Sequence, residues 1–342
     1  MISTPKVSVV MPAYNAAVYL DEAVTSILNQ TFREFEFIVI NDGSTDDTAS
    51  ILDKYEKSDS RIRVYHQENQ GMIAALNRGC RLARGEYIAR MDADDVSFRD
   101  RLEKQVEYIE KHPQIGILGT WICREKDGSM AGNWCPSTNS KILKWDNFFG
   151  VCVAHATVLM RRDVIERLNF YRPEAIDGED GDLWLRASAI TEFGNVPEVL
   201  YRVRVWPGST SQLLSQSRRD VHVRLLTSFI KQFLNVDPPV EAVAGLRQTR
   251  IGPPFSDLSQ IRLTATLIQK LYEKFMKENS VNPQERKEIA WDAANRVASL
   301  ALQASRFDSR SSASLLLQAL HLDYRLLRPS VMMKGLRRVC SK

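Results

Sequence analysis

The chain has 342 residues, of which 44% are hydrophobic and 26% are charged, and its formal net charge is +4. This length and composition allow a large buried core and roughly two domains, and the balanced charge argues against a nucleic-acid partner. The five cysteines are widely spaced and include no CxxC pair, so we predict reduced thiols. The sequence shows no signal-peptide pattern and no apolar run of ~20 residues, so we predict a soluble or peripheral protein of the cytoplasm.

The first 120 residues alternate short β-branched runs with helical patterns, which is typical of a mostly parallel sheet with crossover helices. The run at 35–40 is almost entirely apolar, as expected for a strand that is covered on both faces. Residues 127–139 are rich in Gly, Ser, Asn and Pro and are expected to form a loop. The expected strands are 7–11, 35–40, 62–66, 87–91, 116–123, 151–160 and 196–205, and the expected helices are 17–29, one beginning near 45, 71–83, 99–111 and 180–189.

Strand signals end near Ser211, and the rest of the sequence follows helical patterns. Asn282 followed by Pro283 is a good helix start, because Asn caps a helix and Pro suits its first position. We therefore predict an α/β domain at residues 1–211 and an α-helical domain at residues 212–342. The second domain ends in a basic tail with apolar residues between its charges, which are Arg325, Arg328, Lys334, Arg337, Arg338 and Lys342.

Polar residues follow three strands of the predicted sheet, at the point where each strand ends. They form the segments 12–15, 41–44 and 92–95, which read Pro-Ala-Tyr-Asn, Asn-Asp-Gly-Ser and Asp-Ala-Asp-Asp. Because ligands bind beyond the carboxyl ends of the strands in an open parallel sheet, these segments predict a binding site. Neither GxGxxG nor GxxxxGK[ST] follows the first strand, which argues against a dinucleotide dehydrogenase and a P-loop enzyme.

Asp92, Asp94 and Asp95 place three carboxylates in four residues, and their repulsion is costly unless a cation is present. Mg²⁺ or Mn²⁺ fits, because these hard cations take carboxylate oxygens and are commonly completed by substrate phosphates. The alternative is a solvated acidic turn that caps the helix at Arg99. From the acidic spacing alone, the two interpretations have equal weight.

Taken together, these motifs resemble those of the family 2 glycosyltransferases. The resemblance covers about residues 6–210 and implies the GT-A nucleotide-diphospho-sugar transferase fold, a mostly parallel sheet flanked by helices, with a helical region at the C-terminus. Each motif alone is weak, whereas their order and spacing are specific. The matching pieces are residues 9–15, 39–46, Asn69-Gln70-Gly71 with Asn77, Gly79 and Gly85, 92–95, and Glu179-Asp180 leading into 182–186.

The resemblance implies a donor-binding role for the ends of the first two strands. Asp42 resembles the family aspartate that hydrogen-bonds the nucleotide base, and Pro12, Ala13 and Tyr14 resemble the wall of that pocket. The alternative is that Asp42 and Gly43 only form a turn, for which their sequence is well suited. The other donor-binding residues that the resemblance implies are Asn15, Gly71, Asp92, Ala93 and Arg202.

Asp92 and Asp94 match the DxD element of the family. The resemblance assigns Asp94 to the metal and Asp92 to the ribose or to a metal-bound water, while Asp95 is either a second ligand or a helix cap. His155 lies in an apolar run, where a lone histidine is commonly a satisfied core residue. Some relatives place a histidine near the metal or the leaving diphosphate, so we count His155 with the metal ligands.

Asp180 matches the acidic pair of the family and is our candidate for the catalytic base, with Glu179 as the second choice. Asp182 is expected to orient its neighbours. The alternative is that Glu179 and Asp180 are ordinary acids at the start of a helix. Gly181 stands where a larger residue is common, and we expect it to widen the acceptor side.

The segment after the last predicted strand departs from the family. Relatives often have a histidine after the Tyr-Arg pair, whereas this chain has Arg204 and then Trp206-Pro207-Gly208. The phosphate contact that relatives make here, near the cluster at 209–211, therefore does not transfer directly to this sequence.

The resemblance predicts an inverting, metal-dependent glycosyltransferase that uses Mn²⁺ or Mg²⁺. It would move a sugar from a nucleotide diphosphate donor, UDP being the first to expect, to a hydroxyl of a saccharide or lipid-linked saccharide. The implied pathways are the synthesis of cell-surface polysaccharide, lipopolysaccharide or glycolipid. The alternative is a nucleotide-sugar-binding protein that has lost catalysis, but all the expected acids are present. A nucleotidyltransferase would need a Gly-rich basic loop after the first strand.

The basic tail has two interpretations. It is either a solvated charged end or a segment that holds the enzyme at an anionic membrane surface, where each Lys or Arg contributes about 1 kcal/mol. We favour peripheral contact with the cytoplasmic face of the membrane, because the enzymes that this chain resembles often glycosylate lipid-linked acceptors.

Overall fold

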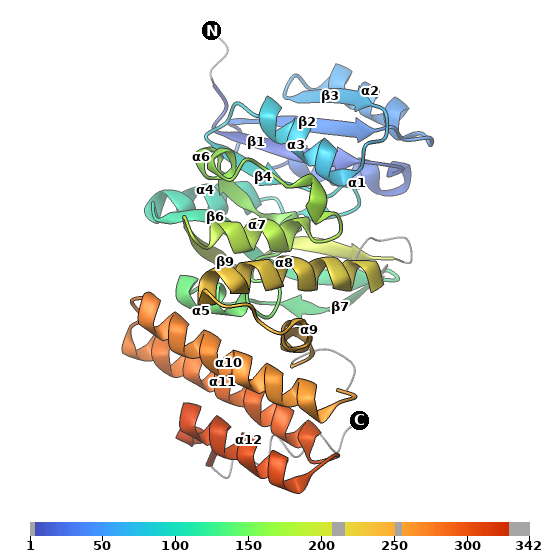
Figure 1. Cartoon of the computed structure of the whole chain (residues 1–342). Helices are drawn as coiled ribbons and strands as arrows, with labels where there is room; N and C mark the ends of the chain where they lie inside the picture. Colours follow the sequence, from blue (N-terminus) through green and yellow to red (C-terminus); the bar gives the residue numbers. More distant parts are fainter. Residues whose placement is uncertain (1–3, 207–215, 250–254, 328–342) are drawn as a thin grey trace. The chain divides into compact units, whose positions relative to one another are not determined.

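The structure of the chain is a computed structural model that describes residues 4–206, 216–249 and 255–327 (Figure 1). The chain divides into two compact units, one made of residues 1–147 and 151–222 and the other of residues 148–150 and 223–342. The predicted domain boundary after residue 211 lies outside the described residues, so it stays a prediction.

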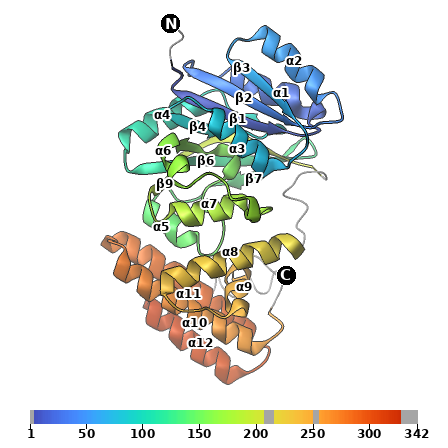
Figure 2. The same ribbon diagram turned by 45° about the horizontal axis from the view of Figure 1, so that its top comes forward.

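The first unit is built on one mixed sheet, whose strand order is β3-β2-β1-β4-β8-β6-β9-β5, with β7 paired to β6 (Figures 1 and 2). Within it, β1 is parallel to β2 and β4, and β2 is parallel to β3, which confirms the parallel sheet predicted for the first half of the sequence. β8 is antiparallel to β4 and β6, and β5 is antiparallel to β9. The strands are β1 (Val7–Ala13), β2 (Phe35–Asp42), β3 (Ile62–Gln67), β4 (Tyr87–Arg90), β5 (Val96–Ser97), β6 (Ile115–Lys126), β7 (Ser129–Trp134), β8 (Leu159–Arg161) and β9 (Glu192–Val205).

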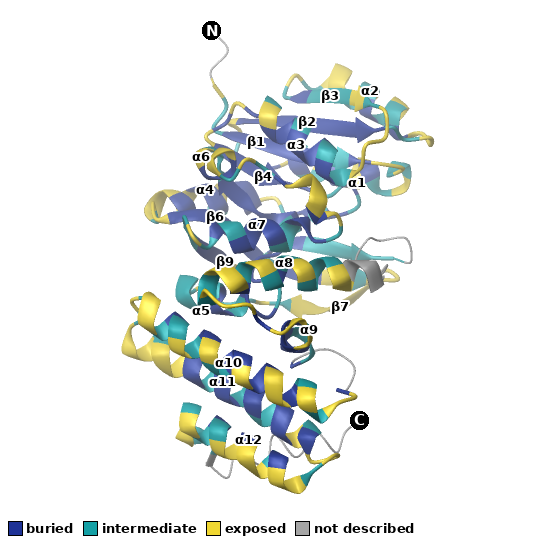
Figure 3. Cartoon of the chain, viewed as in Figure 1, coloured by how far each residue is buried: buried dark blue, intermediate teal, exposed yellow. Residues whose placement is uncertain are grey.

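Alternate residues of the central strands enter two hydrophobic cores, one on each face of the sheet. Along β2, Phe37 and Val39 lie in one core with α1 and α4, whereas Ile38 and Ile40 lie in the other with α3 and α7. All of β2 is buried, as its apolar sequence predicted (Figure 3). The helices are α1 (Ala17–Leu28), α2 (Thr48–Ser58), α3 (Met72–Leu82), α4 (Arg101–Lys111), α5 (Ser140–Asp146), α6 (Arg162–Arg167) and α7 (Glu179–Ala187), with short 3₁₀ helices η1 (His155–Thr157) and η2 (Pro173–Ala175).

The segment 127–139 was expected to be a loop, but it contains the second strand of a hairpin. β6 and β7 pair in antiparallel register, and Lys126 lies opposite Ser129. The two residues between them, Asp127 and Gly128, both have positive φ, at 50° and 75°. Asp-Gly with two positive φ values is the pattern of a tight two-residue hairpin turn, so this signal was present in the sequence and was missed.

The single strand predicted at 151–160 was also wrong. That apolar run instead forms the 3₁₀ helix η1, followed by the short strand β8. The turn is closed locally, because both the backbone N–H and the hydroxyl of Thr157 donate to the carbonyl oxygen of Ala154, at 3.0 and 2.9 Å. Continuous apolar sequence reports burial and does not distinguish a strand from other buried structure.

The second unit is helical in the part that the structure describes (Figure 1). As predicted, Asn282 begins a helix: its side chain accepts from the N–H groups of Gln284 and Glu285, and the Glu285 side chain accepts from the N–H of Asn282. No described helix is long and apolar enough to cross a membrane. The helices are α8 (Gln216–Leu234), α9 (Val240–Gln248), α10 (Leu258–Glu278), α11 (Pro283–Ala304), α12 (Ser309–Leu322) and η3 (Tyr324–Leu327), of which α8 begins within the first unit.

Candidate functional site

The loops after β1 and β2 are tied to each other by side chains of the predicted motifs. Asn15 has a φ of 48°, and its side-chain oxygen accepts a hydrogen bond from the N–H of Thr45 at 2.8 Å. In return, the Ser44 hydroxyl accepts from the N–H of Asn15 at 3.0 Å. Asp46 accepts from the N–H of Ala17 at the start of α1, at 3.1 Å. These polar residues hold the sheet edge in shape, and Tyr14 beside them is 53% exposed and accessible to a ligand.

Asp42 ends β2 and is buried. One of its carboxylate oxygens accepts from the Gln67 side chain at 2.7 Å and from the N–H of Gln70 at 3.0 Å, and the other accepts from the N–H of Gly71 at 2.8 Å. Asp42 therefore shapes the loop that leads into α3. Gly71, which was predicted to bind the donor, belongs to this loop and has a φ of 86°. Contact of Asp42 with a nucleotide base stays a prediction.

Arg90 and Asp92 form an ion pair at the end of β4. The Arg90 guanidinium is buried, and its Nη1 donates to an Asp92 carboxylate oxygen at 2.6 Å. Burial alone would lower the pKa of Arg90, but the charge of Asp92, its hydrogen bond to the guanidinium and nearby tyrosines together outweigh this and raise the pKa. Asp92 is held further by its backbone N–H, which donates to the Tyr201 hydroxyl at 3.2 Å. Arg90 therefore neutralises Asp92, one of the three clustered acids.

Asp94 and Asp95 lack such a cationic partner among their described contacts. Burial raises the pKa of Asp94, and the charge of Asp92 raises it further. The pKa of Asp95 is raised well above its usual range by burial and then by both neighbouring acids. Asp95 was expected to be a metal ligand or a helix cap. Its carboxylate accepts from the backbone N–H of Arg204 at 2.8 Å and so links the turn to β9. The N-cap residue of α4 is Asp100, so Asp95 does not cap that helix, and its role as a metal ligand stays a prediction.

These residues fit a divalent cation that is completed by a ligand. Burial first and then repulsion between neighbouring acids raise the pKa values of Asp94 and Asp95, and a bound cation would relieve the repulsion. Among the described residues, no group of three or more His, Cys, Asp or Glu side chains is placed to hold a metal ion by itself. Asp92 and Asp94 would thus supply only part of a coordination shell. Mg²⁺ sites of this kind are commonly completed by water and substrate phosphates.

His155 lies in a buried cluster with other residues. Its Nε2 is 2.9 Å from the Tyr171 hydroxyl, its Nδ1 is 3.9 Å from a Glu179 carboxylate oxygen, and its ring packs edge-on to Trp184. Burial, and then the charge of Arg90, lower its pKa well below the usual value, so the imidazole is neutral. These contacts fit a satisfied core histidine, and its role as a metal ligand stays a prediction.

The start of α7 carries three acids in different environments. Glu179 is buried beside His155, and Asp182 is buried and accepts from Arg186 Nε at 2.7 Å. Asp180 is partly exposed, and its carboxylate accepts a hydrogen bond from the N–H of Gly181 at 2.7 Å. The helix itself is anchored in the core by the buried side chain of Trp184. Asp180 is therefore the acid of the three that is best placed to meet a substrate.

Gly181 does not open space on the acceptor side, contrary to expectation. A Cβ at this position would lie 2.7 Å from Nε2 of His222, so the imidazole ring of α8 already occupies the volume that the glycine leaves. The glycine lets the His222 ring of α8 pack directly against α7.

Ion pairs with the end of β9 bring to the site two acids that were not predicted, Glu22 and Glu125. Arg202, expected to bind the donor, forms ion pairs with Glu22 of α1 and with Glu125 at 2.9 Å. Arg204 also pairs with Glu22, at 2.5 Å. Glu22 and Glu125 lie within a helix and a strand, and nothing in their local sequence pointed to this site. The cluster at 209–211 lies outside the described residues.

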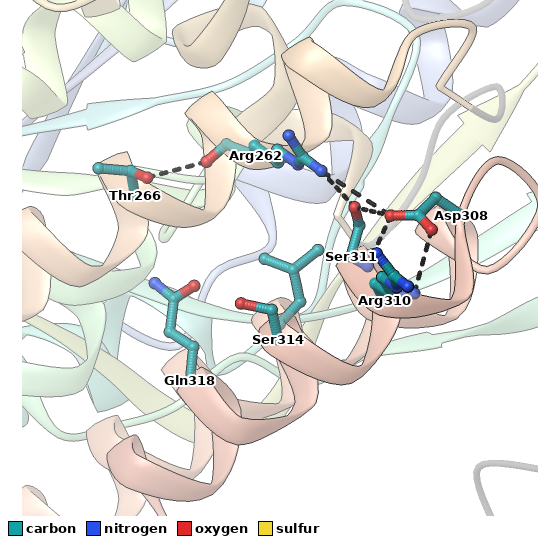
Figure 4. Close-up of a pocket in the computed structure, with 8 residues that line it drawn as sticks. Arg262, Thr266, Asp308, Arg310, Ser311, Ser314 and Gln318 are labelled. Carbon is teal, nitrogen blue, oxygen red and sulfur yellow. Dashed lines mark hydrogen bonds and ion pairs between the residues drawn. The ribbon is translucent and has the colours of Figure 1, made fainter.

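A polar pocket of about 460 Å³ lies in the second unit, between α10 and α12 (Figure 4). Two of its charged groups are partnered: Arg262 lies 3.9 Å from the Asp308 carboxylate, and Asp308 also accepts from the N–H of Ser311 at the start of α12. We assign no chemistry to this pocket. Its other lining residues are Thr266, Arg310, Ser314, Leu315 and Gln318.

Comparison with known sequences identifies relatives of the chain. The sequence model of glycosyl transferase family 2 matches residues 8–168. An uncharacterized glycosyltransferase of Haemophilus influenzae is 34% identical over 247 residues, which cover 69% of this chain and 76% of that protein. A putative glycosyltransferase of Bacillus subtilis, EpsE, is 37% identical and covers 60% of this chain and 74% of its own length. Three Rickettsia relatives are longer, and the alignments cover 32 to 38% of them.

Comparison with solved structures finds the same fold in proteins of low identity. Staphylococcus aureus TarS, residues 1–349, in complex with UDP-GlcNAc, has a TM-score of 0.58 and 16% identity, over 94% of this chain and 91% of that one. The mannosyltransferase PcManGT of Pyrobaculum calidifontis, in complex with GDP-Man and Mn²⁺, has a TM-score of 0.53 and 17% identity, over 95% and 88%. At this identity the likeness concerns the fold alone.

Proposed function

The chain belongs to glycosyl transferase family 2 and has the GT-A fold, and from this premise we propose that it is an inverting enzyme that transfers a sugar from a nucleotide diphosphate to an acceptor hydroxyl. The observation that carries the proposal is the Asp92–Asp94 pair after β4, where one acid is neutralised by Arg90 and the other has a raised pKa. Excess negative charge in a fixed turn at a sheet edge suits a cation-bound diphosphate.

Donor binding is assigned to the edge formed by the ends of β1, β2 and β4. Asp94 would hold Mn²⁺ or Mg²⁺, and Asp92 would contact the ribose or a metal-bound water. When bound, the cation would neutralise charge on the departing diphosphate. The exposed ring of Tyr14 and the Asp42 loop are proposed to meet the nucleotide base. UDP is the first nucleotide to test, since TarS was solved with UDP-GlcNAc, and GDP is the second because of PcManGT.

Acceptor activation is assigned to Asp180. In an inverting displacement the acceptor oxygen bonds to the anomeric carbon, the bond from that carbon to the diphosphate oxygen breaks, and a base takes the acceptor proton. Asp180 suits the base because it is partly exposed at the start of a helix that Trp184 anchors in the core. Glu179 is the second choice, because it is buried against His155.

The acceptor is proposed to be a saccharide or a lipid-linked saccharide, in the synthesis of cell-surface polysaccharide, lipopolysaccharide or glycolipid. We place the enzyme in the cytoplasm with its basic tail against the membrane face. Of that tail, residues 328–342 lie outside the described residues, and Arg325 is paired with the buried carboxylate of Asp323. Sedimentation with vesicles that contain anionic lipid, compared with neutral vesicles, tests this placement.

The test of function is turnover. The purified chain is incubated with Mn²⁺ and with UDP-, GDP- and dTDP-sugars, with and without oligosaccharide or lipid-linked acceptors, and the released nucleoside diphosphate is measured. Release from one donor that increases with an acceptor supports the proposal. The anomeric configuration of the product, read by proton NMR, tests inversion. Tight binding of a nucleotide sugar with no release under any condition would favour the catalytically inactive alternative.

A further inference from the structure

The last residues of β9 face the acidic turn that follows β4. Arg202, Arg204 and Trp206 alternate along the chain, so their side chains emerge on one face of the strand and its continuation. Arg204 holds the turn from two sides: its backbone N–H donates to the Asp95 carboxylate at 2.8 Å, and its guanidinium donates to the carbonyl oxygen of Asp94 at 2.7 Å. The backbone of the acidic turn is therefore fixed by β9.

Trp206 adds a contact to the Asp94 side chain itself. Its indole Nε1–H donates to Oδ2 of Asp94 at 2.9 Å. The indole is held in turn, because its ring centroid lies 5.7 Å from that of Tyr19 in α1, and Tyr19 also stacks under the Arg204 guanidinium at 4.3 Å. Tyr19 of α1 thus supports Arg204 and Trp206, the two residues that contact Asp94.

An indole has properties that suit an orienting role. It offers one N–H donor and no acceptor, and it carries no charge. It can therefore fix one oxygen of Asp94 without neutralising the carboxylate, as an arginine or lysine would. Trp206 holds Oδ2 of Asp94 while the carboxylate keeps its negative charge for a cation.

We propose that Trp206 is a positioning residue for the donor site, which holds the Asp94 carboxylate in the orientation in which it would meet the cation and diphosphate. The inference rests on the proposed donor-binding function. Groups that orient metal ligands by hydrogen bonds typically contribute 10- to 100-fold to metal affinity. Loss of the indole N–H should therefore weaken the cation-dependent part of nucleotide binding and leave the cation-independent part unchanged.

The chain offers a matched control in Trp121. Its indole Nε1–H also donates one hydrogen bond, to the carbonyl oxygen of Pro136 at 3.0 Å, and it is likewise half-buried. Trp206→Phe and Trp121→Phe each remove one indole N–H from a partly buried ring in the same unit. A general effect of losing a tryptophan should therefore appear in both variants.

The experiment is calorimetric titration of the intact chain and both variants with UDP, with and without Mn²⁺, well below the Tm of every protein. We expect Trp206→Phe to weaken UDP binding at least about 10-fold in Mn²⁺ only, and Trp121→Phe to bind as the native chain does. Trp206→His, which keeps a ring N–H donor, should recover part of the loss. In turnover, the donor KM of Trp206→Phe should rise more than its kcat falls.

The outcomes separate this inference from the function on which it rests. If the native chain binds no nucleotide, the proposed donor site fails. If the native chain binds UDP with Mn²⁺ and Trp206→Phe binds equally well, only the positioning role is wrong. A loss of affinity that is equal with and without Mn²⁺ would also overturn it, since the effect would then not act through the cation ligand.

Discussion

The buried guanidinium of Arg90 is paired with Asp92 at 2.6 Å, directly where β4 gives way to the acidic turn. This pairing makes the two acids of the DxD element unequal. Asp92 has a permanent cationic partner within the fold, whereas Asp94 accepts a side-chain hydrogen bond from the neutral N–H of Trp206. This asymmetry suits a cation site, because Asp92 is fixed by Arg90 and Asp94 keeps its charge for the cation.

Removal of the Arg90 guanidinium should destabilise the fold. Arg90→Met leaves Asp92 beside a buried apolar group, and the loss of one partner of a largely buried pair should lower the free energy of unfolding by about 2 to 4 kcal/mol. Arg162→Met is the control, because Arg162 pairs with Glu166 at 3.3 Å with both side chains exposed, and it should change stability by less than about 1 kcal/mol. Urea unfolding measures both, and equal effects would contradict the account.

Packing of His222 against Gly181 gives a second test. Gly181→Ala should lower stability by about 1 kcal/mol, because the added Cβ meets the imidazole and overpacks the contact. In a His222→Ala background the same change should raise stability by about 0.5 to 1 kcal/mol, as expected for Gly to Ala within a helix. A double-mutant cycle by thermal unfolding compares them. An identical effect in both backgrounds would show that the two residues do not interact.

The stability of the acidic turn should depend on pH through Asp95. Its folded pKa is raised above the usual value of 3.8, so the folded state is penalised at pH values above the folded pKa, and the penalty is absent below 3.8. Asp95→Asn should therefore stabilise the metal-free protein at neutral pH. The amide oxygen can still accept from the N–H of Arg204. This gain in stability should shrink as the pH falls to 3.8. Urea unfolding in the presence of a chelator, repeated at several pH values, measures it. A gain that is constant with pH would contradict the raised pKa of Asp95.

Substitution of Asp180 should separate transfer from donor binding. Asp180→Asn removes the proposed base, so the transfer rate should fall at least about 100-fold while UDP affinity stays unchanged. Asp163→Asn is the matched control, because Asp163 is an exposed acid in the first turn of α6 and should leave both quantities unaltered. Full transfer activity in Asp180→Asn would move the role to Glu179, for which Glu179→Gln is the next variant.

The sequence was most informative where local pattern and tertiary environment agree. The strands β1 to β4 and the positions of Asp42 and Asp92 at their carboxyl ends followed from apolar runs and the polar residues after them. The hairpin at Asp127 was missed although its turn signal was visible, because the surrounding composition resembled a loop. The strand expected through His155 was wrong because continuous burial is shared by several backbone conformations.

The connections within the site could not be predicted from the sequence. Tyr19 and Glu22 lie on α1, more than 180 residues before Arg204, and only the folded sheet brings them together. Likewise, nothing near Gly181 indicated that the ring of His222 would fill its space. Contacts of this kind depend on tertiary packing rather than on local pattern, so a single sequence carries no signal for them.

The most direct test of the central claim is calorimetric titration of the native chain with UDP, GDP and dTDP, each with and without Mn²⁺. The account predicts that one nucleotide binds tightly, that Mn²⁺ is required for most of the affinity, and that Asp94→Asn abolishes the Mn²⁺-dependent part. Failure of every nucleotide to bind, in the presence and absence of Mn²⁺, would contradict a donor site at the edge formed by β1, β2 and β4.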